Sequence, residues 1–245
     1  MKLVFFDARV WRYVVSAISK IIEEGAFVVN SEGLRFKAMD PSHVVMIDYF
    51  IPASAFEEFE VEGEEVIGVN FEDIAKIMRR ATKEDKLGLE TEGLKLIISL
   101  IGKGVRNFIL PQLSLTTESL PEPQIEFNVK VRILSDLFKD MVKDLEPIGD
   151  ILYLEASEEE FKAIATSDLG EAEVVIGRES GNIIEFEVKE PSKASYSIDY
   201  FVDMSAATNA ANTISIEFST DMPSKIEFEL PQEGRLTFYV APRVE

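Results

Sequence analysis

The 245-residue sequence contains no cysteine and a single histidine, His43. The lack of cysteine excludes disulfide bonds, thiolate metal sites and cysteine nucleophiles, and one histidine excludes histidine-type zinc sites and most Ser–His relays. Lys and Arg number only 25 against 45 Asp and Glu, a net charge of −20, which excludes a nucleic-acid binder that is basic all round. No apolar run is long enough to span a membrane, and Asp7 interrupts the N-terminal run too early for a signal peptide. We therefore expect an intracellular, cytoplasmic protein with no cofactor and no metal.

Hydrophobic residues make up 46% of the chain, enough for a sizeable core. Apolar residues at helical spacing predict a first helix over residues 10–24, which Gly25 is expected to end. Asn70 is a plausible N-cap for a second helix over residues 71–81. Short alternating runs between the helices are typical of strands. The other two predicted helices cover residues 135–145 and 200–210.

The two halves of the chain resemble each other. The tetrapeptide at residues 36–39, FKAM, recurs at 161–164 as FKAI, and FEDI at 71–74 recurs at 201–204 as FVDM. A proline-rich stretch at the middle of the chain is typical of an extended linker. The pattern predicts an α+β protein of two similar domains, each an antiparallel sheet with two helices. The predicted boundaries are 1–110 for the N-terminal domain, 111–125 for the connector and 126–245 for the C-terminal domain.

Basic residues gather on the polar faces of three of the four predicted helices. Exposed helix faces are often rich in lysine, which is the simpler interpretation. If the three faces point the same way, they form a positive surface on an acidic body, suited to contact phosphates without reading bases. The fourth helix lacks Lys and Arg and carries Asp199 and Asp203.

The chain resembles the proliferating cell nuclear antigen family, the DNA sliding clamps of archaeal and eukaryotic type, over essentially its whole length. The most specific stretches are LRFKAMDPSHV at residues 34–44, GVNFEDIAKIMR at 68–79, IGD at 148–150, and LPQEG followed by YVAPR within 230–243. The resemblance implies a non-catalytic ring of three two-domain chains around duplex DNA. Such a ring tethers DNA polymerase, and also a clamp loader, flap endonuclease and DNA ligase, which bring short peptide motifs. The positions that match the family's DNA-facing residues are Arg12, Lys20, Lys76, Arg79, Arg80 and Lys143.

The resemblance also implies an apolar pocket for the partner motif between the connector and the C-terminus. The matching residues are Met39, His43, Val44, Met46, Leu115, Leu120, Pro223, Tyr239, Ala241 and Pro242. Without the resemblance, core packing would explain the two methionines and a capped turn would explain His43.

Ring closure in the family joins an edge strand of each domain head to tail. The matching edges are residues 105–110 and 172–177, and the predicted subunit-interface residues are Arg106, Phe108, Val174 and Arg178. The two arginines are candidates for interface ion pairs, with ordinary surface solvation as the alternative. The ring's other chains are either copies of this chain or sister clamp subunits.

The two alternative functions are an enzyme and a clamp-like scaffold. An enzyme would use paired carboxylates for acid–base work or Mg²⁺, but the acids occur mainly in runs typical of solvated surface, and no phosphate loop or nucleophile elbow is present. A clamp-like scaffold would bind partner peptides without encircling DNA, and it would not need the basic helix faces.

Overall fold

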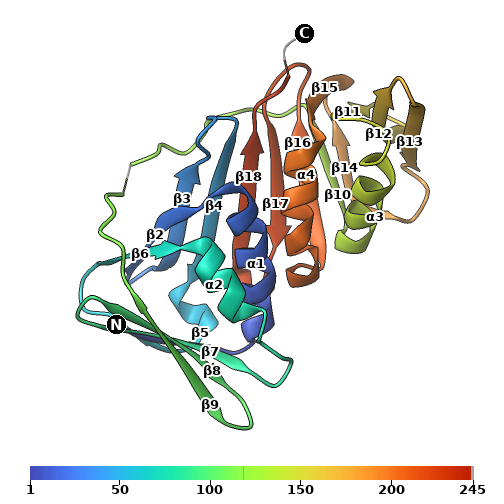
Figure 1. Cartoon of the computed structure of the whole chain (residues 1–245). Coiled ribbons are helices and arrows are strands. Elements are labelled where there is room, and N and C mark those ends of the chain that lie inside the picture. The colour runs from blue at the N-terminus through green and yellow to red at the C-terminus, as the bar shows by residue number, and fades with distance from the viewer. Residues whose placement is uncertain (118, 244–245) are drawn as a thin grey trace.

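The computed structural model describes residues 1–117 and 119–243 and builds them into three antiparallel sheets with a row of helices (Figure 1). The N-terminal strands are β1 (Lys2–Phe5), β2 (Glu24–Asn30), β3 (Gly33–Met39), β4 (Val45–Pro52), β5 (Phe56–Glu60), β6 (Glu65–Asn70), β7 (Lys86–Glu92), β8 (Lys95–Ile101) and β9 (Val105–Pro111). The C-terminal strands are β10 (Val129–Leu134), β11 (Ile151–Ala156), β12 (Glu160–Ser167), β13 (Gly170–Gly177), β14 (Ile183–Val188), β15 (Ser192–Ser197), β16 (Thr213–Phe218), β17 (Ser224–Glu229) and β18 (Arg235–Val240). The helices are α1 (Ala8–Ile21), α2 (Phe71–Met78), α3 (Ser135–Leu145) and α4 (Ile198–Met204), with short 3₁₀ segments η1 (Ala53–Ala55), η2 (Ser205–Ala210) and η3 (Pro231–Glu233).

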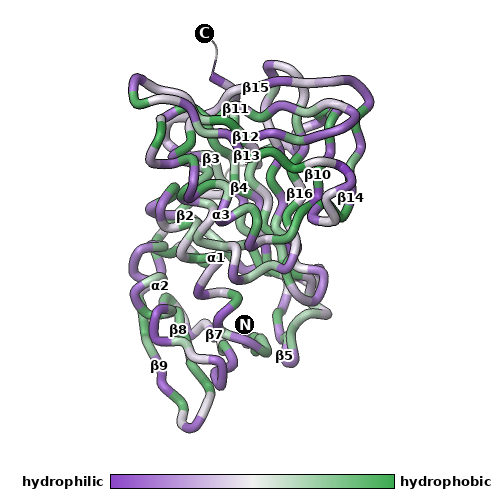
Figure 2. The backbone as a smooth tube through the Cα atoms, turned by 90° about the vertical axis from the view of Figure 1, so that its right-hand side faces the viewer, coloured by the Kyte–Doolittle hydropathy of each residue, from purple (hydrophilic) through white to green (hydrophobic). Residues whose placement is uncertain are grey.

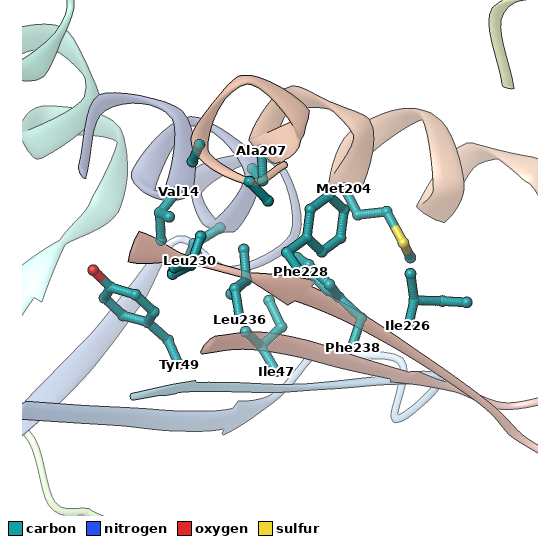
Figure 3. Packing of buried hydrophobic residues seen from close by; sticks show 14 of the residues in the cluster. Val14, Ile47, Tyr49, Met204, Ala207, Ile226, Phe228, Leu230, Leu236 and Phe238 are labelled. Atoms are coloured by element: carbon teal, nitrogen blue, oxygen red, sulfur yellow. The ribbon is translucent and has the colours of Figure 1, made fainter. Parts of the chain in front are cut away.

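The widest sheet joins the two halves of the chain. Its strand order is β14-β10-β16-β17-β18-β4-β3-β2-β6, so β18 of the second half pairs directly with β4 of the first. Alternate residues of these strands turn one face of the sheet towards the helices. Figure 3 shows Ile47, Phe228 and Phe238 on that face, packed under Val14 of α1 and Met204 of α4. One continuous core therefore lies between this sheet and the helices.

The two smaller sheets lie at opposite ends of the molecule (Figures 1 and 2). The five-stranded sheet has the order β5-β1-β7-β8-β9 and the four-stranded sheet has the order β13-β12-β11-β15. Strands β9 and β13 are therefore edge strands, as the family resemblance implies for both segments. The alternating pattern indicates neither β1, which is short and precedes the first helix, nor β5, which lies within an acidic run that contains Glu57 and Glu58.

The prediction for the end of the first helix was wrong. Helix α1 ends at Ile21, and Gly25 lies inside β2 in an extended conformation rather than at a helix C-terminus. A Cβ atom on Gly25 would come within 2.5 Å of the Phe36 ring, so glycine is needed here for close packing. The prediction for the fourth helix was also wrong in its bounds. Helix α4 begins two residues earlier, at Ile198, and ends at Met204, and the rest of the predicted helix forms the 3₁₀ segment η2.

Helices α2 and α3 begin where the sequence predicts, whereas α1 begins at Ala8, two residues before its predicted start. Asn70 caps α2 by accepting a hydrogen bond from the backbone N–H of Asp73 at 3.1 Å, as predicted, although α2 ends at Met78 rather than near residue 81. Helix α3 has the predicted bounds. The repeated tetrapeptides lie on corresponding elements but at different positions along them. FKAM and FKAI lie on the second strands of the hairpins β2–β3 and β11–β12, FEDI begins α2, and FVDM ends α4.

The proline-rich connector leaves β9 and runs along the outside of the nine-stranded sheet (Figure 1). Leu113 bridges to Gly68 on the edge strand β6, where a side chain would clash because a Cβ on Gly68 would lie 2.1 Å from the Leu113 carbonyl oxygen. Further along, the Lys37 ammonium donates to the Pro121 carbonyl oxygen at 3.1 Å. These contacts hold the described part of the connector to the sheet. Glu118 lies outside the described residues.

Candidate nucleic-acid and partner interfaces

The four helices form one row on a single face of the nine-stranded sheet, which we call the helix row: α2, α1, α4 with η2, and α3. Helix α1 packs beside α2 on one side and beside α4 and η2 on the other, and α3 packs beside η2. Each helix turns its apolar residues down into the shared core. The polar faces of the three basic helices therefore lie on the same side of the molecule, as the phosphate-contact hypothesis requires.

The six basic residues predicted to face DNA differ in their surroundings. Arg79, Arg80 and Lys143 are exposed, and their side chains form no ion pair with any described residue. The Arg12 guanidinium is half-buried and donates a hydrogen bond to the Ala81 carbonyl oxygen at 3.3 Å.

The other two of the six are paired with acids. The Lys76 ammonium lies 3.1 Å from the Glu72 carboxylate and 3.2 Å from Asp73, all on α2. The Lys20 ammonium of α1 lies 3.6 Å from Asp203 Oδ1 of α4.

The carboxyl group of Asp203 is half-buried between the helices. Burial raises its pKa above the ordinary value of 3.8, Lys20 acts to lower it, and the charges of Asp199 and Glu146 raise it further. The net effect is a raised pKa. An acidic sector therefore interrupts the basic surface where α4 meets α1 and the C-terminus of α3.

Five of the predicted pocket residues come together at one end of the nine-stranded sheet. Met46 on β4 lies opposite Met39 on β3 and opposite Tyr239 on β18, and Ala241 N–H donates to the Val44 carbonyl oxygen at 2.8 Å. Met46 is buried and the other four are half-buried. Strand alternation turns the Met46 and Tyr239 side chains to the face opposite the helix row.

The remaining predicted pocket residues lie on the segments around this group. Pro242 follows Ala241, and Pro223 directly precedes β17, whose first residue pairs with Val240. Leu115 and Leu120 are half-buried in the connector. His43 is exposed in the β3–β4 turn with a φ of 57°, in the left-handed region, so the structure places it in a turn beside the group.

The β3–β4 turn is organised by Asp40, a residue to which sequence analysis gave no role. Its carboxylate accepts hydrogen bonds from the backbone N–H groups of Ser42 at 3.1 Å and of Val44 and Val45 at 2.7 Å, and from the Ser42 hydroxyl. Burial acts to raise the pKa of Asp40, but these hydrogen bonds outweigh it and lower the pKa below 3.8. The signal was present in the sequence, because an Asp-Pro-Ser run is typical of a turn in which Asp accepts from the following backbone.

Arg106, Phe108 and Val174 lie on the edge strands and Arg178 directly follows β13. Both arginines already have partners within the chain. The Arg106 guanidinium lies 2.6 Å from the buried Asp85 carboxylate and donates to the Arg80 carbonyl oxygen at 3.3 Å. Arg178 donates to the carbonyl oxygen of Glu158 at 3.0 Å and stacks over the Phe186 ring.

The edge strands β9 and β13 expose unpaired backbone groups and apolar side chains. Val105 and Ile109 on β9 are about 60% exposed, at 62% and 60%, and Val175 on β13 is 44% exposed. Phe108 and Val174 turn inward and pack against the core. Exposed edge strands of this kind are ready to pair with another strand.

Within the described residues, no group of three or more His, Asp or Glu side chains is placed to hold a metal ion. The helices of the described part of the chain are too short or too polar to cross a membrane.

Comparison with known proteins gives consistent matches over nearly the whole chain. The family profile of the proliferating cell nuclear antigen N-terminal domain matches residues 1–105, and that of the C-terminal domain matches residues 122–243. The chain is 43% identical to DNA polymerase sliding clamp 3 of Aeropyrum pernix, over 98% of this chain and 97% of that protein.

Two solved structures resemble the fold closely. The crystal structure of PCNA from Thermococcus kodakaraensis superposes with a TM-score of 0.93 at 28% identity, covering 99% of both chains. The PCNA2–PCNA3 complex from Sulfolobus tokodaii gives a TM-score of 0.94 at 32% identity, covering 100% of both chains.

Proposed function

The chain belongs to the proliferating cell nuclear antigen family of DNA polymerase sliding clamps, and from this premise we propose how its residues perform that role. As a clamp subunit it encircles duplex DNA and tethers DNA polymerase, acting as a processivity factor. The helix row faces the DNA. The ring has three subunits, works on DNA inside the cell and has no catalytic activity of its own. The proposed domain boundaries are 1–110, 111–125 and 126–245.

The observation that supports this orientation most strongly is the group of unpaired cations on the helix row. Arg79, Arg80 and Lys143 stand on one face of a molecule whose net charge is −20, and none of them has an acidic partner among the described residues. A cation without a partner on a strongly acidic body is available to a phosphate. Arg79 and Arg80 directly follow α2 and Lys143 lies on α3. Contacts of these side chains with the DNA backbone would be independent of sequence.

Partner proteins are proposed to bind on the opposite face, at the end of the nine-stranded sheet. The methionines Met39 and Met46 supply adaptable apolar surface beside Tyr239, and Leu120 of the connector completes the pocket. DNA polymerase, the clamp loader, flap endonuclease and DNA ligase would each insert a short motif with paired aromatic residues here. His43 and the Ala241–Val44 hydrogen bond border this pocket.

The ring is proposed to close through β9 and β13. These edge strands lie at opposite ends of the molecule (Figure 2), which suits head-to-tail pairing of one chain's β9 with the next chain's β13. Copies of this chain or sister clamp subunits supply the neighbours. The mass of the purified chain, measured by light scattering, distinguishes the two cases: three times the monomer mass indicates a self-closing ring.

The DNA-facing role is tested by Arg79→Glu with Lys143→Glu. The double variant should keep the parent's native mass, because neither side chain contributes to an edge strand, and should stimulate a polymerase less. Lys95→Glu with Lys189→Glu is the matched control, since both lysines are exposed and lie off the helix row. Equal stimulation by parent and test variant would remove Arg79 and Lys143 from the DNA-facing surface and favour a scaffold that binds peptides only.

A further inference from the structure

We infer that Asp203 screens Lys20 from DNA and so removes this lysine from the phosphate contacts of the helix row. The inference rests on the proposed DNA-facing role of the helix row and adds a specificity determinant to it. The helix row then has a phosphate-contacting sector, which contains Arg79, Arg80 and Lys143, and a screened sector where α1 meets α4.

The ion pair that defines the screened sector joins two helices. Lys20 Nζ of α1 lies 3.6 Å from Asp203 Oδ1 of α4, with the side chains 43% and 31% exposed. The helices pack beside each other, so the pair is held by the fold and not by one flexible side chain. Partial burial strengthens the attraction over that of a fully solvated pair.

Further acids surround this pair. Asp199, one turn earlier on α4, and Glu146, at the C-terminus of α3, lie close enough to raise the pKa of Asp203. Helix α4 carries no basic residue to offset them. Asp199 and Glu146 therefore add negative charge around Asp203, which opposes an approaching phosphate.

The ion pairs of Lys76 differ from the Lys20–Asp203 pair. Glu72 and Asp73 lie on the same helix as Lys76, and all three side chains are more than half exposed. Exposed pairs of this type contribute little to stability, so a phosphate displaces them readily. Lys76 therefore stays available to DNA, whereas Lys20 does not.

The physical consequence is measurable as a salt dependence. A lysine that binds a phosphate releases condensed counterions from DNA, and the logarithm of the binding constant falls by about 0.9 per contact for each unit of log salt concentration. A lysine that already holds an internal carboxylate adds little to this slope. Removing the carboxylate should restore the contact.

The experiment is a double-mutant cycle with the purified chain in the assembly it forms in solution. Parent, Asp203→Asn, Lys20→Gln and the double variant are titrated with fluorescent duplex DNA, by anisotropy, over a series of salt concentrations. Asp203→Asn should tighten binding about three- to tenfold at low salt and steepen the salt slope by about 0.9. Lys20→Gln should weaken binding at least threefold more in the Asp203→Asn background than in the parent.

The matched control is Glu185→Gln. Its carboxylate lies 2.9 Å from Lys130, with exposures of 32% and 36% that closely match those of the Asp203 pair, and it removes the same charge. Alternation along β10 turns Lys130 away from the helix row, because its neighbours Val129 and Val131 are buried on the other face. This variant should bind DNA as the parent does.

Two results would overturn the inference: unchanged binding by Asp203→Asn, or an equal effect of Lys20→Gln in both backgrounds. An equal gain from Asp203→Asn and Glu185→Gln would also overturn it, because net charge alone would then explain the effect. The Arg79→Glu, Lys143→Glu variant is measured in parallel. If it binds DNA as tightly as the parent, the proposed DNA-facing role fails; if it binds less tightly while the cycle is additive, only the screening by Asp203 fails.

Discussion

Replacing Asp40 should both destabilise the protein and weaken its binding to partner peptides. Asp40 is 5% exposed, and its carboxylate accepts hydrogen bonds from the backbone N–H groups of Ser42, Val44 and Val45. Val44 in turn accepts the Ala241 N–H, which brings the C-terminal segment against the proposed pocket. The turn therefore connects one buried carboxylate to the geometry of the partner site.

The size of the effect follows from which N–H groups lose their partner. Val45 is fully buried and water cannot reach its N–H group, Val44 is half-buried, and Ser42 is exposed and can be solvated. An unsatisfied buried donor costs about 1–3 kcal/mol, so Asp40→Ala should lower the free energy of unfolding by about 2–4 kcal/mol. Asp40→Asn keeps one carbonyl oxygen as an acceptor for Val44 and Val45 and should cost about half as much.

The assay is urea unfolding at neutral pH and matched protein concentration, because subunit association adds to apparent stability. Calorimetry with a peptide that contains Gln, an aliphatic residue and paired aromatics gives the affinity of the pocket. We expect both the free energy of unfolding and the peptide affinity to decrease in the order parent, Asp40→Asn, Asp40→Ala. An Asp40→Ala variant within 0.5 kcal/mol of the parent, with equal peptide affinity, would refute the role given to this turn.

The Asp40 carboxylate should also make the stability of the protein depend on pH. Because the folded pKa of Asp40 is lowered below 3.8, its contribution to stability is present above that value and is lost as the pH falls through the folded pKa. The stability difference between parent and Asp40→Ala should therefore shrink as unfolding is measured at decreasing pH below about 4. A difference that stays constant down to pH 2 would contradict the assignment.

Three further predictions concern the pocket and the edges. Leu120→Ala with Tyr239→Ala should weaken partner-peptide binding by about 2 kcal/mol or more by calorimetry, as for other hot-spot truncations, and equal affinity would place the pocket elsewhere. Ile109→Lys should reduce the native mass measured by light scattering, because it puts a charge on the exposed edge of β9; an unchanged mass would exclude this edge from subunit pairing. Arg106→Gln should lower the free energy of unfolding by about 1–3 kcal/mol, since it leaves the buried Asp85 carboxylate without its cation, and a neutral effect in urea would show that water or the Thr82 hydrogen bonds replace it.

Local structure could be predicted where a short-range rule operates. Helix α3 has the predicted bounds because its apolar residues repeat at helical spacing between two polar stretches, and α2 begins after Asn70 because that side chain caps it. The edge strands β9 and β13 could be predicted through the family resemblance. Gly25 was misinterpreted because a glycine that ends a helix and one that admits the Phe36 ring look the same in sequence.

The relations that define the interfaces could not be predicted, because they join residues far apart in the chain. Nothing local shows that β18 pairs with β4 and brings Tyr239 beside Met46. The Lys20–Asp203 pair joins helices whose separate faces suggested one basic helix and one acidic one. Likewise, no local pattern shows that Arg106 pairs with Asp85 of the same chain.

The most direct test of the central claim is retention on circular DNA. The clamp, assembled with itself or with sister subunits, is loaded by a clamp loader onto a nicked circular duplex, and the DNA-bound fraction is separated by gel filtration at a salt concentration that removes simple electrostatic binding. The account predicts that the protein stays with the circle and is lost when a restriction enzyme linearises it. Equal retention on circular and linear DNA, or no retention on either under conditions in which the same subunits form a closed ring, would contradict encirclement.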